Sequence, residues 1–127
     1  MAAPTVESRR RRRMFLMTAD PALAAGVAAA LPAGWEMVHP RSPDELGEFQ
    51  DVLQYRFVVL DLDDAGEADA LDVIDAIRRD MMLNVPIFCC GGDAGRRDAA
   101  RLARADRCFE RGELAARLPA FCEQFGW

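Results

Sequence analysis

Short apolar runs alternate with amphipathic stretches along the chain. Five of these runs have the length of a strand: Met14–Thr18, Trp35–His39, Phe57–Leu60, Val85–Cys90 and Arg107–Phe109. A continuous apolar run, as in Phe57–Leu60, is typical of a parallel strand that helices cover on both faces. A helical pattern follows each run, so the chain contains five strand–helix units. We therefore predict an α/β domain with one doubly wound, five-stranded parallel sheet in the order 2-1-3-4-5, a flavodoxin-like arrangement.

The helical segments carry their own start and stop signals. Asp20 and Pro21 predict an N-cap followed by the first helical position. Residues 42–45 (Ser-Pro-Asp-Glu) predict a capping box that opens a helix with Leu46, Phe49 and Leu53 buried. The helix after Gly92 should turn Ala99, Leu102 and Ala103 inward and leave Arg96, Arg97, Arg101 and Arg104 as a solvated face. Pro119 should kink or shorten the last helix.

Composition and charge narrow the function classes. The chain has 127 residues, 51% of them hydrophobic and 29% charged, which is enough to bury one core and argues against wholesale disorder. The net charge of the whole chain is −5. Five arginines and one glutamate give residues 1–13 a charge of +4, so the remaining residues carry −9. We predict a disordered Arg-rich leader over 1–13 and a domain over 14–127. The acidic body argues against nucleic-acid binding. The absence of a long uncharged apolar stretch argues against a membrane span, so we expect a cytoplasmic protein.

The cysteines and the single histidine do not suggest a metal centre or a catalytic pair. Cys89 and Cys90 are adjacent, and Cys108 and Cys122 are widely spaced, which matches no zinc-finger or CxxC spacing. Buried free thiols are the default interpretation. His39 would have to serve in any Ser-His or Cys-His pair, and nothing near it in the sequence favours that role.

The predicted topology brings several polar residues to one edge of the sheet. In this fold, ligands bind at the carboxyl ends of the first and third strands, and Asp20, Asp61, Gly91 and Arg111 all follow strands at that edge. Asp61 ends a buried apolar run, which favours a functional carboxylate, although a solvated loop position is the alternative. Asp20 is explained equally well as a helix N-cap. Gly91 and its neighbour Gly92 could cradle a phosphate through backbone N–H groups or form a plain turn.

From Arg13 to the C-terminus the chain resembles the receiver domain of bacterial response regulators. The resemblance rests on five segments in the family's order: residues 15–20 (FLMTAD), 57–61 (FVVLD), 69–78 (the helix that opens Asp-Ala-Leu), 85–88 (VPIF) and 105–111 (ADRCFER). It implies that Asp61 is the phosphoacceptor and that Arg111 takes the place of the family's lysine. It also implies that Asp20, Asp61 and the backbone carbonyl of Asp63 could hold Mg²⁺.

Several positions depart from the family pattern. Ala19 stands where the first of two adjacent acids is usual, Gly91 where the hydroxyl of Ser or Thr is usual, and Cys108 where the aromatic switch residue is usual. Arg111 keeps a positive charge but has a planar fork, and Gly112 replaces the proline expected after it. We therefore predict a degenerate "pseudo" receiver that binds Mg²⁺ weakly, needs no other cofactor and is not an enzyme.

The resemblance also implies partners and leaves alternatives. A sensor kinase or an output protein would be the partner. A weak homodimer could form through the region Arg97–Arg117, whose charges alternate in sign: Arg97, Arg101, Arg104 and Arg117 with Asp98, Asp106 and Glu110. The segment 84–93 is also similar to the receiver-like, non-catalytic wing of basic amino-acid decarboxylases, which serves assembly. A small flavodoxin-like enzyme is the least favoured alternative, because no Gly-rich phosphate loop follows the first strand.

Overall fold

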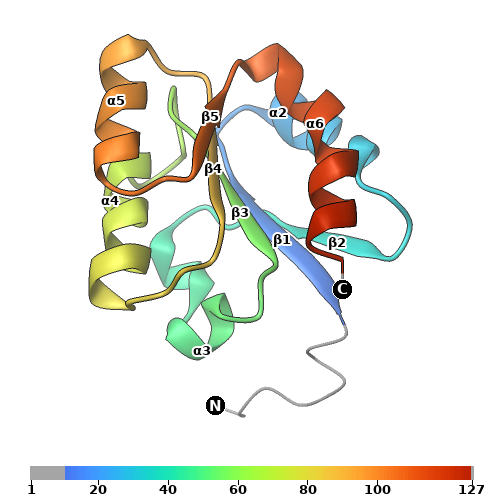
Figure 1. Ribbon diagram of the computed structural model, residues 1–127, viewed down its shortest axis with the longest axis horizontal. Coiled ribbons are helices and arrows are strands. Elements are labelled where there is room, and N and C mark those ends of the chain that lie inside the picture. Colours follow the sequence, from blue (N-terminus) through green and yellow to red (C-terminus); the bar gives the residue numbers. More distant parts are fainter. Residues whose placement is uncertain (1–10, 127) are drawn as a thin grey trace.

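The computed structural model describes residues 11–126 and places a five-stranded parallel sheet between two layers of helices (Figure 1). The strands lie in the order β2-β1-β3-β4-β5, which confirms the predicted topology. In chain order they are β1 (Arg12–Met17), β2 (Trp35–Val38), β3 (Phe57–Asp61), β4 (Ile87–Cys90) and β5 (Arg107–Phe109). Each observed strand lies within two residues of its predicted bounds.

The helices cover both faces of the sheet, as right-handed parallel connections require. In Figure 1, α4 and α5 lie on one side of the sheet, and α2 and α6 on the other. The helical segments are α2 (Pro21–Ala30), the 3₁₀ turn η1 (Pro43–Leu46), α3 (Phe49–Val52), α4 (Ala70–Asp75), the π-helical turn η2 (Ala76–Asp80), α5 (Ala94–Leu102) and α6 (Arg111–Gln124).

Alternation along β1 builds the two halves of the core. Phe15 and Met17 pack with α4 and η2, whereas Met14 and Leu16 pack with α2 and α6. All four side chains are fully buried, and β3 is buried at every position. On the α6 side the core is aromatic, with the rings of Phe88 and Phe121 stacked at 4.3 Å between centroids. Burial on both faces explains why the sequence of β3 shows no polar alternation.

The segment predicted as one helix from the 42–45 signal is two short ones. The 3₁₀ turn η1 ends at Gly47, whose φ is +81°, and α3 begins only at Phe49. The Ser42 side chain makes no capping hydrogen bond; the Glu45 carboxylate instead accepts from the backbone N–H of Arg41 at 2.8 Å. Leu46 is buried as predicted, Leu53 is exposed, and the side chain of Phe49 lies outside the described part. The left-handed glycine breaks the helix that the capping box predicted.

Two predictions about the later helices are corrected, and a third is answered in part. Pro119 lies inside α6, which continues to Gln124, so this proline does not shorten the helix. On α5 the buried residue is Ala100, and Leu102 is 86% exposed, so the helix is rotated relative to the predicted face. The arginines of α5 are not a uniformly solvated face, because Arg96 donates to the backbone oxygen of Leu62 at 2.9 Å and pairs with Asp69 at 2.9 Å.

The N-terminal boundary also differs from the prediction. Strand β1 includes Arg12 and Arg13, so the predicted division at Met14 falls within a strand, and residues 1–10 of the predicted leader lie outside the described residues. Among residues 11–126, no helix is long and apolar enough to cross a bilayer.

Candidate functional site: an acid cluster closed by Arg111

The carboxyl ends of the strands bring the predicted site residues together. Asp20 follows β1, Asp61 is the last residue of β3, Gly91 follows β4, and Arg111 opens α6. The side chains of Asp20, Asp61 and Arg111 line one small hollow with Asp63 and Asp64. The parallel topology alone accounts for this meeting, because it places every strand-to-helix loop at the same edge.

Asp61 is buried, and both oxygens of its carboxylate are engaged. The residue is 1% exposed. Its Oδ1 accepts from Nη1 of Arg111 at 2.6 Å and from the backbone N–H of Asp63 at 3.0 Å. Its Oδ2 accepts from the hydroxyl of Thr18 at 2.7 Å. Three donors therefore satisfy a carboxylate that has almost no contact with solvent, as a buried charge requires.

Arg111 is the centre of the cluster. Its guanidinium contacts three carboxylates: Asp61 at 2.6 Å and Asp63 at 3.1 Å through Nη1, and Asp20 at 2.6 Å through Nη2. The hydrogen bond to Asp61 is the first cause of a raised Arg111 pKa, and burial opposes it. A planar fork of donors can serve several acids at once, which a lysine ammonium at the same position does less well.

Asp20 serves the helix and the cluster at the same time. Its Oδ1 accepts from the backbone N–H of Ala22 at 2.9 Å, which confirms the predicted N-cap of α2. Its Oδ2 accepts from Arg111. The hydrogen bond from Ala22 is the main reason why the pKa of Asp20 is lowered, and the Arg111 guanidinium adds to the effect. The N-cap and the ion pair with Arg111 therefore use different oxygens of one carboxylate.

Asp63 is held through its side chain, whereas the sequence suggested a role for its backbone carbonyl. The carboxylate accepts from the backbone N–H of Gly92 at 3.0 Å and from Arg111. The N–H of Gly91 donates to the backbone oxygen of Phe109 at 3.0 Å. Both N–H groups of the glycine pair are thus used inside the chain, and the anion that the turn holds is the Asp63 carboxylate.

Gly91 occupies a position that a side chain does not fit. Its φ is +72°, a left-handed conformation that favours glycine. A Cβ at this position would run into the carboxylate of Asp63 and approach Cγ of Arg111 to 3.2 Å. The turn therefore favours glycine at position 91, and a serine or threonine hydroxyl does not fit there without a rearrangement.

The three predicted metal ligands do not fit a divalent ion in this arrangement. One oxygen of each carboxylate faces the Arg111 guanidinium, which occupies the space that the three share. Within residues 11–126, no group of three or more His, Cys, Asp or Glu side chains is arranged to hold a metal ion. A cation could use these oxygens only after Arg111 moved away.

Sequence reasoning missed Thr18, but its interpretation of Cys90 as a buried free thiol is confirmed. The Thr18 hydroxyl donates to Asp61 and accepts from the backbone N–H of Asp20 at 3.0 Å, so it joins two of the acids. A polar residue ending the apolar run 14–18 was the available signal. Cys90 is fully buried, and burial, with the charge of Asp61, raises the pKa of its thiol to about 12. It is therefore no nucleophile at neutral pH.

Several solved structures have a similar fold. The chain is similar to a signal receiver domain from Bermanella marisrubri (TM-score 0.71, 21% identity, covering 89% of this chain and 96% of that one). It is similar to a signal receiver domain of a histidine kinase from Clostridium thermocellum (TM-score 0.72, 15% identity, 91% and 97%). It is also similar to the phosphorylated cyanobacterial phytochrome response regulator RcpA (TM-score 0.67, 16% identity, 91% and 89%).

The chain has the receiver fold. No protein-family model matches the sequence, and no curated protein matches it. The receiver fold is thus recognised by its three-dimensional structure, over about nine-tenths of the chain. The acid cluster closed by Arg111 lies at the edge of the sheet where the sequence predicted the site.

Proposed function

We propose that this receiver-like chain is a pseudo-receiver of two-component signal transduction, which acts through protein contacts and not through phosphoryl transfer to Asp61. The observation that carries the proposal is the Arg111 guanidinium bound to three carboxylates at 2.6–3.1 Å. The proposal gives the chain no enzymatic reaction of its own.

The state of Asp61 supports this proposal. A carboxylate that attacks a phosphodonor needs a free oxygen and access to the donor. Asp61 is 1% exposed, and its oxygens accept from Arg111, Asp63 and Thr18. At least one of these hydrogen bonds must break, and the loops must open, before a phosphorus atom can approach.

The surroundings of Asp61 support it further. Phosphoryl transfer depends on groups that stabilise the charge on the transferring oxygens. Gly91 offers no hydroxyl, and the N–H of Gly92 already donates to Asp63. Arg111 is committed to three acids. The groups that could stabilise a phosphoryl group are therefore either missing or occupied.

We also propose that divalent ions bind weakly. Three carboxylates and one guanidinium leave a net charge of −2, which attracts a cation to the rim of the cluster. The oxygens that would coordinate it face Arg111 instead. A cation is therefore attracted by the charge of the cluster but finds few free oxygens to coordinate it, so its binding is weak and sensitive to salt.

The test is incubation with Mg²⁺ and acetyl phosphate, followed by intact mass. We expect no stable one-phosphate mass shift. A working receiver domain treated in parallel shows that the donor is active, and an Asp61→Asn variant identifies the site of any modification. A one-phosphate shift that disappears in Asp61→Asn would overturn the proposal.

The contact surface that we propose includes α5, β5 and the start of α6, the region Arg97–Arg117. Its charges are largely paired within the chain: Arg101 with Asp98 at 3.2 Å and Arg97 with Glu110 at 3.6 Å. Asp106 belongs to a different set, because its carboxylate accepts from Arg78. Competition with these internal pairs makes a homodimer through the region weak, and the exposed Leu102 adds an apolar contact.

Sedimentation at low and at high salt tests this dimer. We expect a monomer–dimer equilibrium that high salt shifts toward the monomer, and a further shift in a Leu102→Ser variant. A monomer at high protein concentration and low salt would exclude the homodimer and leave a sensor kinase or an output protein as the partner of this face.

The decarboxylase-type wing and the flavodoxin-like enzyme remain alternatives. The buried, fully hydrogen-bonded carboxylate at the end of β3 favours the receiver interpretation over the wing, since a purely structural module has no need of an acid there. The loop from β1 to α2, residues 18–20, contains no glycine, which argues against a phosphate-binding enzyme of the flavodoxin kind.

A further inference from the structure

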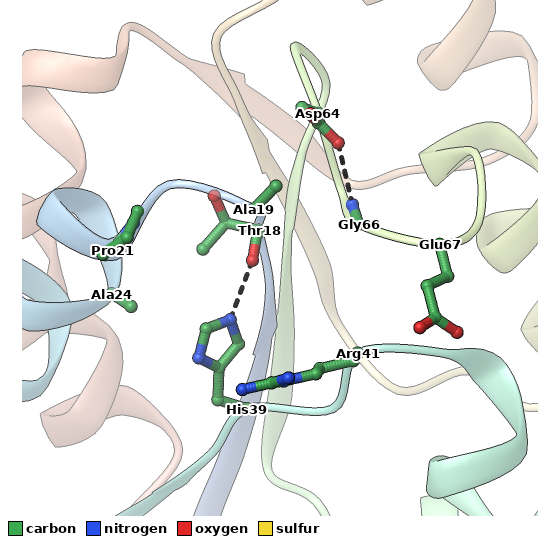
Figure 2. A pocket seen from close by; sticks show the side chains of 9 residues that line it. All are labelled: Thr18, Ala19, Pro21, Ala24, His39, Arg41, Asp64, Gly66 and Glu67. Atoms are coloured by element: carbon green, nitrogen blue, oxygen red, sulfur yellow. Dashed lines mark hydrogen bonds between the residues drawn. The ribbon is translucent and has the colours of Figure 1, made fainter.

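A second cavity lies beside the acid cluster, on the β2 side of β1. Its volume is about 520 Å³, within the range of small-molecule sites. Figure 2 shows Pro21 and Ala24 of α2 on one side and Gly66 and Glu67 of the β3–α4 loop on the other, with the Arg41 side chain reaching between them beside the His39 ring. The sequence analysis discussed two of these residues, Pro21 as a helix start and His39 as the single histidine. It did not assign the others to a site.

Hydrogen bonds tie the three loops around this cavity to one another. The N–H of Ala19 donates to the backbone oxygen of Asp64 at 2.9 Å, and the N–H of Glu67 donates to that of Arg41 at 3.1 Å. Nε2 of His39 donates to the backbone oxygen of Thr18 at 2.8 Å, since a carbonyl oxygen can only accept. The walls are therefore fixed before any ligand arrives, which lowers the entropic cost of binding.

Two charged side chains of the cavity, Arg41 and Glu67, have opposite charges, whereas the carboxylate of Asp64, which also lines it, accepts from the backbone N–H of Gly66 at 3.0 Å. In the part of the chain that the structure describes, neither the Arg41 guanidinium nor the Glu67 carboxylate has a hydrogen-bond or ion-pair partner. On the α2 side, Pro21 and Ala24 give the cavity an apolar wall. A guanidinium recognises a carboxylate through paired hydrogen bonds, and a carboxylate recognises a protonated amine.

We propose that this cavity binds a small zwitterion of the amino-acid type with an apolar side chain. Arg41 holds the ligand carboxylate, Glu67 holds its ammonium group, and the apolar side chain packs against Pro21 and Ala24. Glu67 repels a second negative charge, so dicarboxylates and phosphates are disfavoured. The site does not depend on phosphorylation of Asp61, but it shares Thr18 with the acid cluster: the Thr18 backbone oxygen accepts from His39, and its hydroxyl donates to Asp61.

The test is an amide-shift titration of the ¹⁵N-labelled chain with the twenty proteinogenic amino acids, starting from L-leucine. We expect saturable shifts below about 10 mM for at least one apolar amino acid, centred on Thr18, Ala19, Ala24, His39 and Glu67. The matched compounds 4-methylpentanoate and 3-methylbutylamine, which each keep one charge of leucine, should bind at least about tenfold more weakly than the zwitterion.

Variants separate this site from nonspecific binding. Arg41→Gln and Glu67→Gln should each weaken binding at least about tenfold, whereas the exposed controls Arg79→Gln and Glu123→Gln should leave it unchanged. Spectral dispersion shows that each variant is folded. The proposal is overturned if no amino acid gives saturable shifts, if Arg41→Gln binds as tightly as the parent chain, or if 4-methylpentanoate binds as tightly as leucine.

Discussion

Two arginines lie at opposite ends of the strands, and their hydrogen-bond partners differ in charge. Arg78, at the start of β4 and β5, donates to the backbone oxygens of Arg104, Leu83 and Val85 at 2.8–3.0 Å and to one carboxylate, Asp106, at 2.9 Å. Arg111, at the carboxyl ends of the strands, donates to carboxylates alone among residues 11–126. One guanidinium joins pieces of backbone, and the other neutralises acids.

The environments act on the two guanidinium groups in opposite directions. Burial lowers the pKa of Arg78, with Asp106 opposing the change, whereas the hydrogen bond to Asp61 raises the pKa of Arg111. Arg78 is 7% exposed, so its loss would leave several backbone oxygens and an acid without a donor. Arg78 therefore holds mainly backbone at the amino ends of β4 and β5, and Arg111 partly neutralises the acid cluster at the carboxyl ends of the strands.

Replacing Arg78 should have the largest effect on folding. We expect Arg78→Met to lower the free energy of unfolding by about 3–5 kcal/mol, because it removes a buried charge from its acid and from three backbone oxygens. Denaturant unfolding measures the loss, and the exposed neighbour Arg79→Met serves as the control. A loss below about 1 kcal/mol would show that this edge does not depend on the guanidinium.

Replacing Arg111 should instead change the affinity for divalent ions. We expect Arg111→Lys to tighten Mn²⁺ or Mg²⁺ binding about tenfold, because a single ammonium cannot keep three carboxylates occupied. Mn²⁺-dependent broadening of the amide signals near Asp20 and Asp61 gives the measurement. Arg117→Lys on the same helix is the control. Unchanged affinity in Arg111→Lys would mean that the guanidinium does not block the acids.

Removing the Thr18 hydroxyl should cost about 1 kcal/mol of stability. Thr18→Val keeps the volume but takes away the donor to Asp61 and the acceptor for Asp20, and Thr18→Ser keeps both. Denaturant unfolding of the two variants compares them directly. If serine is no better than valine, the hydroxyl does not hold the acid cluster together.

The smallest effect should appear on acidification. The folded-state pKa values of Asp20 and Asp69 lie below the ordinary value for an aspartate, because each carboxylate accepts hydrogen bonds. The largest contribution comes from the backbone N–H of Ala22 for Asp20 and from the Arg96 side chain for Asp69. Their contribution to stability is complete above pH 4 and is lost as the pH falls from there through the lowered pKa values. Unfolding midpoints at pH 6 and pH 3 should therefore differ less in Asp69→Asn than in the parent chain.

The sheet and the meeting of the acids could be predicted because they depend on coarse features. Strand-length apolar runs give the strand order, and parallel topology gives the common edge. The face that a helix turns toward the core is harder to predict. On α5, a short helix rich in alanine and arginine, the buried residue is Ala100, and so Leu102 faces solvent against expectation.

The contacts of Arg111 with the three carboxylates could not be predicted from residue types. The sequence places a cation at position 111 and acids at positions 20, 61 and 63, but a pattern does not reveal that one guanidinium reaches all three acids. It also does not reveal where a hydroxyl at the end of a strand will point, so Thr18 was counted as part of an apolar run. Such contacts depend on side-chain rotamers and on loop paths, which only the folded chain defines.

The backbone at Gly91 has a consequence for how this chain can evolve. With φ at +72° and the Asp63 carboxylate against the missing Cβ, a single change of Gly91 to serine or threonine would strain the turn before it supplied a useful hydroxyl. The Asp63 carboxylate would have to turn aside, and that movement breaks its hydrogen bonds with Arg111 and with the Gly92 N–H. A hydroxyl beside Asp61 is therefore not one substitution away, because any side chain at position 91 also requires a rearrangement of the Asp63 carboxylate.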